Sequence, residues 1–357
     1  MSPQSYPIVS YFKAKDYNQL ANDINEVVAL GSGDAGYGQD QLFVNLITSG
    51  TRISRRHWLR LFDAMKFAAV HQGTLLTTPT TLLNGDFRTK AEVVAHMAKI
   101  MDDIEELRAN KLNYTLSKMS IQSNLVSSMN EFVVCEPDPT DEQWGQENQW
   151  YEFRVNFVDA DSMRHFFNAG GEIRIESELD PNLPDIPEGY HFDTSEGWHR
   201  LLFDIGVVKI QHSETVSSKG AGTPGLGYTG LIGSYQNVYT KRANYIGLPN
   251  NAYEVWAKLH SDHQIDVAVY FLNNEHLNTY GGYCGYTGYS GYSGYGGYGG
   301  YSNYITGQIQ GVLSMNVSQQ RADDPHPSRL GVISPSPTYQ ILHDMEGTLY
   351  NPNSPNN

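Results

Sequence analysis

The closest approach to a ligand cluster in this 357-residue sequence is the segment His260-Ser-Asp-His263, followed by Asp266. Imidazole and carboxylate groups can hold zinc or iron, but such sites need three convergent ligands. Two histidines three residues apart do not share one face of a strand, so a solvated turn explains the segment better. The sequence contains neither an HExxH nor a CxxC motif. We therefore predict no metal and no other cofactor.

A pair of carboxylates is the second pattern with chemical potential. Glu172 and Glu176 lie four residues apart in an alternating segment, with Arg174 between them. Glycosidases use paired carboxylates, one of which has a raised pKa. Arg174 would instead keep both carboxylates ionised, which favours a cross-strand ladder of charges. No GxSxG motif is present and no Ser/His/Asp set can be assembled, so we predict that the chain is not an enzyme.

Two glycine-rich segments match the GxGxxG pattern, at residues 31–36 and 220–225. A dinucleotide fold needs such a loop between a strand and a helix, where free backbone N–H groups meet the pyrophosphate. The first segment follows a predicted helix, and Pro224 interrupts the second. Neither segment predicts a nucleotide site.

The most unusual feature is a triplet repeat of tyrosine in residues 280–304, in which Gly precedes seven of the nine tyrosines. The tyrosines are Tyr280, Tyr283, Tyr286, Tyr289, Tyr292, Tyr295, Tyr298, Tyr301 and Tyr304. A period of three matches polyproline II, in which all nine rings would line one edge. The run is either a low-complexity loop or an extended loop that presents tyrosines for interaction.

Arg55 and Arg56 form a further candidate for interaction. They occupy the first turn of a helix expected after Ser54, where basic side chains are unfavourable because the helix N-terminus is itself positive. Their position predicts an acidic partner elsewhere.

Local signals place the helices that would carry these residues. Asp16 and Asp159 can each cap a helix, and Thr89 begins a capping box with Glu92. Gly73 is expected to end the helix that follows Ser54.

Larger changes of pattern divide the chain into regions. Residues 1–125 are expected to form a helical docking region, and residues 126–215 a mixed α/β middle region. Residues 216–345 have strand patterns around the Tyr-Gly run, and residues 346–357 form a loose tail. The expected fold class is α+β, with a mainly antiparallel, sandwich-like β region at the C-terminal end.

The charge balance disfavours two kinds of partner. The chain has 24 Lys and Arg against 39 Asp and Glu, a formal net charge of −15. Nucleic-acid affinity depends on clustered basic residues, and an anionic membrane surface repels an acidic chain. No apolar run approaches the roughly 18 residues that span a bilayer. We expect neither nucleic-acid binding nor membrane insertion.

The segment Asp159–Ile175, DADSMRHFFNAGGEIRI, resembles virion structural proteins of tailed, myovirus-type bacteriophages, including cyanophages. Shorter matches to the same group occur at residues 16–39, 197–206, 311–322 and 334–339. The resemblance implies a virion structural or tail-fibre-like protein. The Tyr-Gly run departs from the pattern of that group.

The resemblance and the composition lead to one functional expectation with two alternatives. The chain is expected to be a virion protein of the tail, neck or fibre-attachment apparatus, assembled in the host cytoplasm. Its partners would be other copies of itself and neighbouring virion proteins. It could instead be an adhesin whose tyrosine row binds host-surface glycans, because aromatic faces stack on sugar rings. The second alternative is a head decoration protein.

Overall fold

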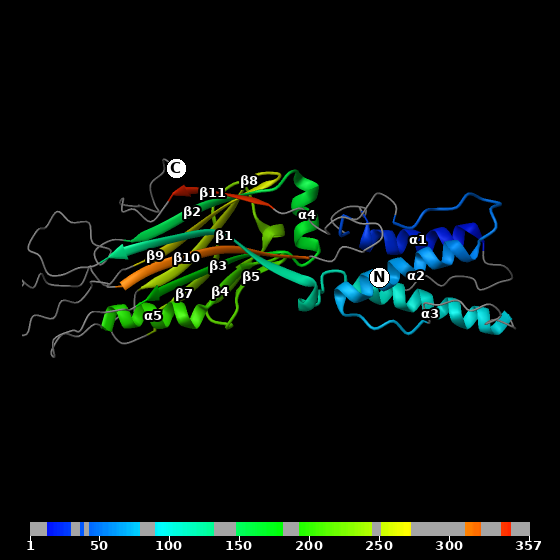
Figure 1. The fold of residues 1–357 in the computed structure, drawn as a ribbon, viewed down its shortest axis with the longest axis horizontal. Helices are drawn as coiled ribbons and strands as arrows, with labels where there is room; N and C mark the ends of the chain where they lie inside the picture. Colours follow the sequence, from blue (N-terminus) through cyan, green and yellow to red (C-terminus); the bar gives the residue numbers. More distant parts are fainter. Residues whose placement is uncertain are drawn as a thin grey trace, which may run out of the picture. The chain divides into compact units, whose positions relative to one another are not determined.

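The computed structural model describes nine stretches of the chain (Figure 1). They are residues 13–29, 36–38, 43–78, 90–131, 148–180, 193–244, 251–272, 311–322 and 337–343. These residues form five α-helices and eleven strands, with helices predominating near the N-terminus and strands after them. The predicted α+β class is therefore confirmed. The Tyr-Gly run and the C-terminal tail lie outside the described residues.

The chain forms two compact units, and each unit collects segments that are far apart in the sequence. The helical unit consists of residues 1–122, 157–172 and 320–337. The sheet unit consists of residues 123–156, 173–319 and 338–357. This discontinuous division differs from the consecutive regions expected from the sequence.

Three helices dominate the helical unit: α1 (Ala14–Val28), α2 (Arg55–Gln72) and α3 (Lys90–Ala109). Their apolar faces bury one core, in which helical spacing brings the side chains of all three helices together. The buried residues include Tyr17, Leu20, Ile24, Leu61, Phe62, Met65, Ile100, Ile104 and Leu107. The short helix α4 (Ala160–Asn168) belongs to the same unit.

The ends of these helices follow the predicted signals with one correction. α2 begins directly after Ser54 and ends at Gly73, whose φ of 77° is left-handed. Asp159 caps α4, because its carboxylate accepts a hydrogen bond from the Ser162 N–H at 2.7 Å. The prediction that Asp16 is the N-cap of α1 is wrong. The N-cap is Lys13, and Asp16 lies in the first turn, where its carboxylate accepts a hydrogen bond from the Lys13 N–H at 2.8 Å. The capping box at Thr89 lies outside the described residues.

The strands have the following bounds. They are β1 (Met119–Glu131), β2 (Gln149–Asn156), β3 (Glu172–Asp180), β4 (Val207–Ile210), β5 (Glu214–Ser217), β6 (Thr223–Leu226), β7 (Gln236–Arg242), β8 (Ala252–Ser261), β9 (Gln264–Leu272), β10 (Gly311–Ala322) and β11 (Thr338–His343). They form one sheet in the order β1-β10-β3-β4-β5-β6-β7-β8-β9-β2-β11.

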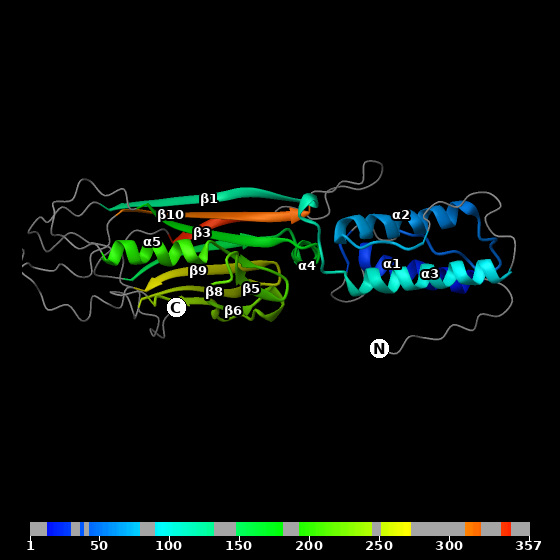
Figure 2. The ribbon, with the colours of Figure 1, turned by 90° about the horizontal axis from the view of Figure 1, so that it is seen from below.

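The sheet curls into a half-barrel, as Figure 2 shows from below. One curled sheet therefore takes the place of the sandwich-like pair of layers expected from the sequence. Strand twist explains the difference, because a twisted sheet of more than about ten strands tends to curl. β1 begins at Met119, inside the region that was predicted to be helical.

Alternation along β2 separates an apolar face from a polar face. Tyr151, Phe153 and Val155 are fully buried on one side, whereas Glu152 and Arg154 between them are partly exposed on the other. The helix α5 (Asp193–Ile205) contributes to the apolar core of the sheet unit, where its Trp198 lies 6.0 Å from Phe271 between ring centroids.

Candidate functional site

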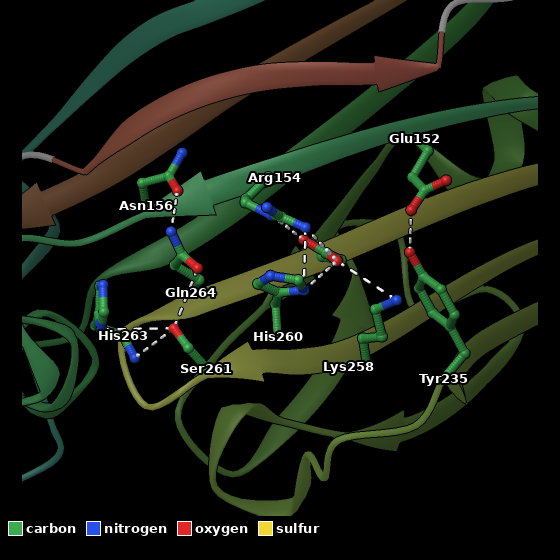
Figure 3. Close-up of polar contacts among 10 residues, drawn as sticks. Glu152, Arg154, Asn156, Tyr235, Lys258, His260, Ser261, His263 and Gln264 are labelled. Carbon is green, nitrogen blue, oxygen red and sulfur yellow. Dashed lines mark hydrogen bonds and ion pairs between the residues drawn. The ribbon is translucent and has the colours of Figure 1, made fainter. Parts of the chain in front are cut away.

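The polar face of the sheet gathers charged side chains around Asp266, and Figure 3 labels three of them, Arg154, Lys258 and His260. The strand register places Arg154 on β2 and Lys258 on β8 directly opposite Asp266 on β9. Arg154 donates to both carboxylate oxygens of Asp266, from Nε at 2.6 Å and from Nη2 at 3.0 Å. The Lys258 Nζ lies 3.5 Å from Oδ2. Asp266 is only 1% exposed, so these two cations neutralise a buried charge.

His260 completes this group, which we call the Asp266 cluster: Arg154, Lys258, His260 and Asp266. The His260 Nδ1 lies 3.0 Å from the Arg154 Nη2 and 3.3 Å from the Asp266 Oδ2. A neutral imidazole can accept from the guanidinium at this atom. The hydrogen bond to Asp266 raises the pKa of Arg154, so the guanidinium stays charged.

His263 does not join His260 in a ligand set. Its Nδ1 lies 2.6 Å from the carboxylate of Asp262, at the tip of the β8–β9 hairpin, where the Asp262 side chain is 78% exposed. Within the described part of the chain, no group of three or more His, Cys, Asp or Glu could hold a metal ion. The predicted turn is present at residues 262–263, whereas Asp266 lies on β9 with its carboxylate buried.

The side chain of Tyr235 extends across the polar face of the sheet. Tyr235 precedes β7, yet its hydroxyl donates to Glu152 on β2, across β8 and β9. The Lys258 Nζ lies 4.2 Å from the centroid of the Tyr235 ring. Burial and the hydrogen bond to Glu152 raise the pKa of Tyr235, so the hydroxyl remains a proton donor. The charged and hydroxyl groups of this face thus connect neighbouring strands of the sheet.

The second predicted carboxylate pattern also has a structural explanation. Glu172 is buried and accepts a hydrogen bond from the Tyr114 hydroxyl at 2.7 Å, whereas Glu176 is exposed. The two carboxylates therefore share no site. The predicted charge ladder is wrong between β3 and β4, because Arg174 faces Lys209 and Glu176 faces a valine.

Arg55 and Arg56, the other predicted interaction residues, lie exposed in the first turn of α2. Neither forms an ion pair with a residue that the structure describes, so their expected acidic partner is not found there. All nine tyrosines of the triplet repeat lie outside the described residues. Sequence reasoning missed Arg154, Lys258 and Tyr235 as partners of Asp266 and Glu152.

Comparison of the chain with known protein families, curated proteins and solved structures found no match. None of the helices in the described residues is long and apolar enough to cross a membrane.

Proposed function

We propose that this chain is a structural protein of a tailed bacteriophage particle, located in the tail, neck or fibre-attachment apparatus. It acts by packing against neighbouring virion proteins and copies of itself, without catalysis. The resemblance of residues 159–175 to virion structural proteins supports the proposal. In the structure these residues form α4 and the beginning of β3.

The edge strand β1 is the observation that carries an assembly role. It has 13 residues, and among the described strands its one neighbour is β10. Residues 119–130 contain no charged residue and no proline, and Ile121 is 61% exposed. Edge strands of monomeric proteins are usually short, charged or interrupted by proline, because open backbone groups pair with other chains. A long uncharged edge therefore favours a position next to another protein.

The polar face of the sheet supports the non-catalytic part of the proposal. The carboxylates of Asp266 and Glu152 are engaged by Arg154, Lys258 and Tyr235. An enzyme of acid–base type needs at least one such group aimed at a substrate.

Mass spectrometry of purified virions tests the proposal. The protein should be present in multiple copies per particle, and its absence from virions would contradict the proposal. Imaging of labelled particles then separates the tail, neck and fibre locations from a head decoration role, which would place the label on the capsid.

The tyrosine repeat favours a second candidate function, that of a host-surface adhesin. Its regular spacing would present aromatic faces for sugars along one edge. Deleting residues 280–304 should leave particles intact and lower their adsorption to host cells. Unchanged adsorption would rule out this candidate and leave the packing role unaffected.

A further inference from the structure

Helices α1, α2 and α3 run in the same direction, so their N-termini gather at one end. Near the start of α1 and α2, the Tyr17 hydroxyl donates to the His57 carbonyl oxygen at 3.0 Å. At the other end, Gln72 Nε2 of α2 donates to the Leu107 carbonyl oxygen of α3 at 3.0 Å. Parallel helices add their dipoles, which makes the N-terminal end of the bundle positive.

Basic side chains occupy this same end and increase its positive charge. Five exposed residues, which we call the basic end, lie there: Lys13, Lys15, Arg52, Arg55 and Arg56. None of the five forms an ion pair with any residue in the described part of the chain. Helix N-termini normally favour acidic side chains, so this arrangement opposes the stability of the helices. A partner that brings negative charge would reverse that penalty.

The rest of the chain carries the complementary charge. Without the basic end, 19 Lys and Arg remain against 39 Asp and Glu, a formal charge of −20. Asp102 and Glu106 form an exposed pair one turn apart on α3. Neither has an ion-pair partner among the described residues. Glu105 lies beside them with its side chain 70% exposed, and we call these three residues the acidic face of α3.

We propose that the basic end binds the acidic face of α3 on a second copy of this chain. The contact is head-to-tail, because it joins the basic end of one copy to the acidic face of the next. An open assembly therefore has an unpaired basic end at one terminus and an unpaired acidic face at the other, so it can extend or close into a ring. This inference rests on the proposed function, because a virion structural protein is used in repeated copies. Nucleic acid is the less favoured partner, because a remaining charge of −20 repels phosphate.

Sedimentation of the full-length chain tests the contact at low and high ionic strength. Association should be detectable at about 50 mM salt and weaken at about 500 mM, where surface charges are screened. The double variant R55E/R56E should raise the dissociation constant at least about tenfold, because like charges then meet. The variant D102K/E106K should do the same from the other side of the contact.

An equimolar mixture of the two variants provides the decisive measurement. The reversed basic end of one variant then meets the reversed acidic face of the other, while the second contact is the natural pair, so association should return. The matched control is K66E/R242E, which changes the net charge equally at exposed positions on α2 and β7, outside the basic end and the acidic face of α3. It should associate as the unaltered chain does. Circular dichroism checks the fold, and R55Q/R56Q replaces R55E/R56E if charge reversal unfolds the helices.

Three outcomes would overturn the inference. One is a mixture that does not recover association, and another is a control that loses association to the same degree. The third is a chain that stays monomeric at both salt concentrations. In that last case, salt-sensitive binding of a DNA oligonucleotide that R55E/R56E removes would identify a nucleic-acid site instead. Each of these results leaves the virion proposal standing, because that proposal is decided by mass spectrometry of particles.

Discussion

Asp266 is the residue on which the polar face of the sheet depends. Its carboxylate is 1% exposed and holds Arg154 and Lys258 on the two neighbouring strands. The substitution Asp266→Asn removes the negative charge and leaves two cations facing each other. We expect a loss of at least about 2 kcal/mol in the free energy of unfolding, because breaking a buried ion pair leaves the remaining charge without its partner. Urea denaturation followed by tryptophan fluorescence measures it.

The hairpin tip supplies a matched control for this substitution. Asp262 pairs with His263, but its side chain is 78% exposed. Asp262→Asn should therefore change the free energy of unfolding by less than about 0.5 kcal/mol, as exposed ion pairs do. Equal effects of the two substitutions would show that burial of Asp266 does not decide its contribution.

Asp103 makes hydrogen bonds in the helical unit whose contribution to the free energy of unfolding depends on pH. Its buried carboxylate accepts hydrogen bonds from the backbone N–H groups of Thr77 and Thr78, at 2.9 and 2.8 Å. Burial by itself would raise the pKa of Asp103, but the hydrogen bonds from Thr78 and Thr77 outweigh it and lower the pKa below 3.8. A lowered pKa in the folded state stabilises the fold above the ordinary pKa. That contribution is lost as the pH falls through the lowered value.

The substitution Asp103→Asn should expose this dependence. At about pH 7 it should cost about 1.5–3 kcal/mol, the range for hydrogen bonds to a charged group. The difference from the unaltered chain should shrink as the pH falls below about 4, because both chains then lack the charge. Urea denaturation at a series of pH values measures the difference. Asp102→Asn, at the exposed neighbouring position, should show no such trend, and a constant difference for Asp103→Asn would refute the charge-based explanation.

The Asp266 cluster shows how far a sequence can predict a site. His260, His263 and Asp266 were selected because they are close in sequence, and two of them proved to be close in space. Arg154 lies 112 residues away and enters only through the register of β2 against β9. Alternation along β2 puts Arg154 on the polar face, but no local signal fixes which residue a neighbouring strand brings opposite it.

At the scale of elements, the ends of helices can be predicted from the sequence better than the pairing of strands can. Ser54, Gly73 and Asp159 mark helix ends by backbone and side-chain preferences that act within a few residues, and the structure confirms all three. β5 (ETVS) and β6 (TPGL) contain no alternation of apolar and polar residues that would predict a strand. Only their neighbours in the sheet make them strands.

The packing of α4 on the turn after α1 gives a prediction at this scale. Gly38 has a φ of +80°, and a Cβ added there would lie 2.3 Å from the Nδ1 of His165 on α4. Gly50 has a similar φ of +85° with nothing within 4 Å. Gly50→Ala should cost about 1 kcal/mol through backbone strain alone. Gly38→Ala should cost about 1–2 kcal/mol more, because the methyl group also displaces His165. Thermal unfolding of both variants measures the gap, and equal losses would contradict the contact.

At the scale of the whole molecule, the helical unit is discontinuous. Its first 122 residues contain α1, α2 and α3, but α4 comes from residues 157–172. Asn168 of α4 donates to the Gly36 carbonyl oxygen at 3.1 Å, and Tyr114 donates to Glu172 at the beginning of β3. Residues 1–122 alone thus lack contacts that complete the helical unit. The sequence pattern had instead predicted a helical region that is continuous in sequence.

A fragment of residues 1–122 tests this consequence. It should retain a helical circular dichroism spectrum but unfold about 10 °C below the helical unit of the full chain, because a loss of about 2 kcal/mol shifts a domain of this size by that amount. The same fragment removes His165, so Gly38→Ala should then cost no more than Gly50→Ala. If the gap between these two variants persists in the fragment, the strain at Gly38 comes from the helices themselves and not from α4. If the difference between the two variants disappears in the fragment, residues 157–172 complete the helical unit. The two units would then have to fold together, because each is built from interleaved parts of one chain.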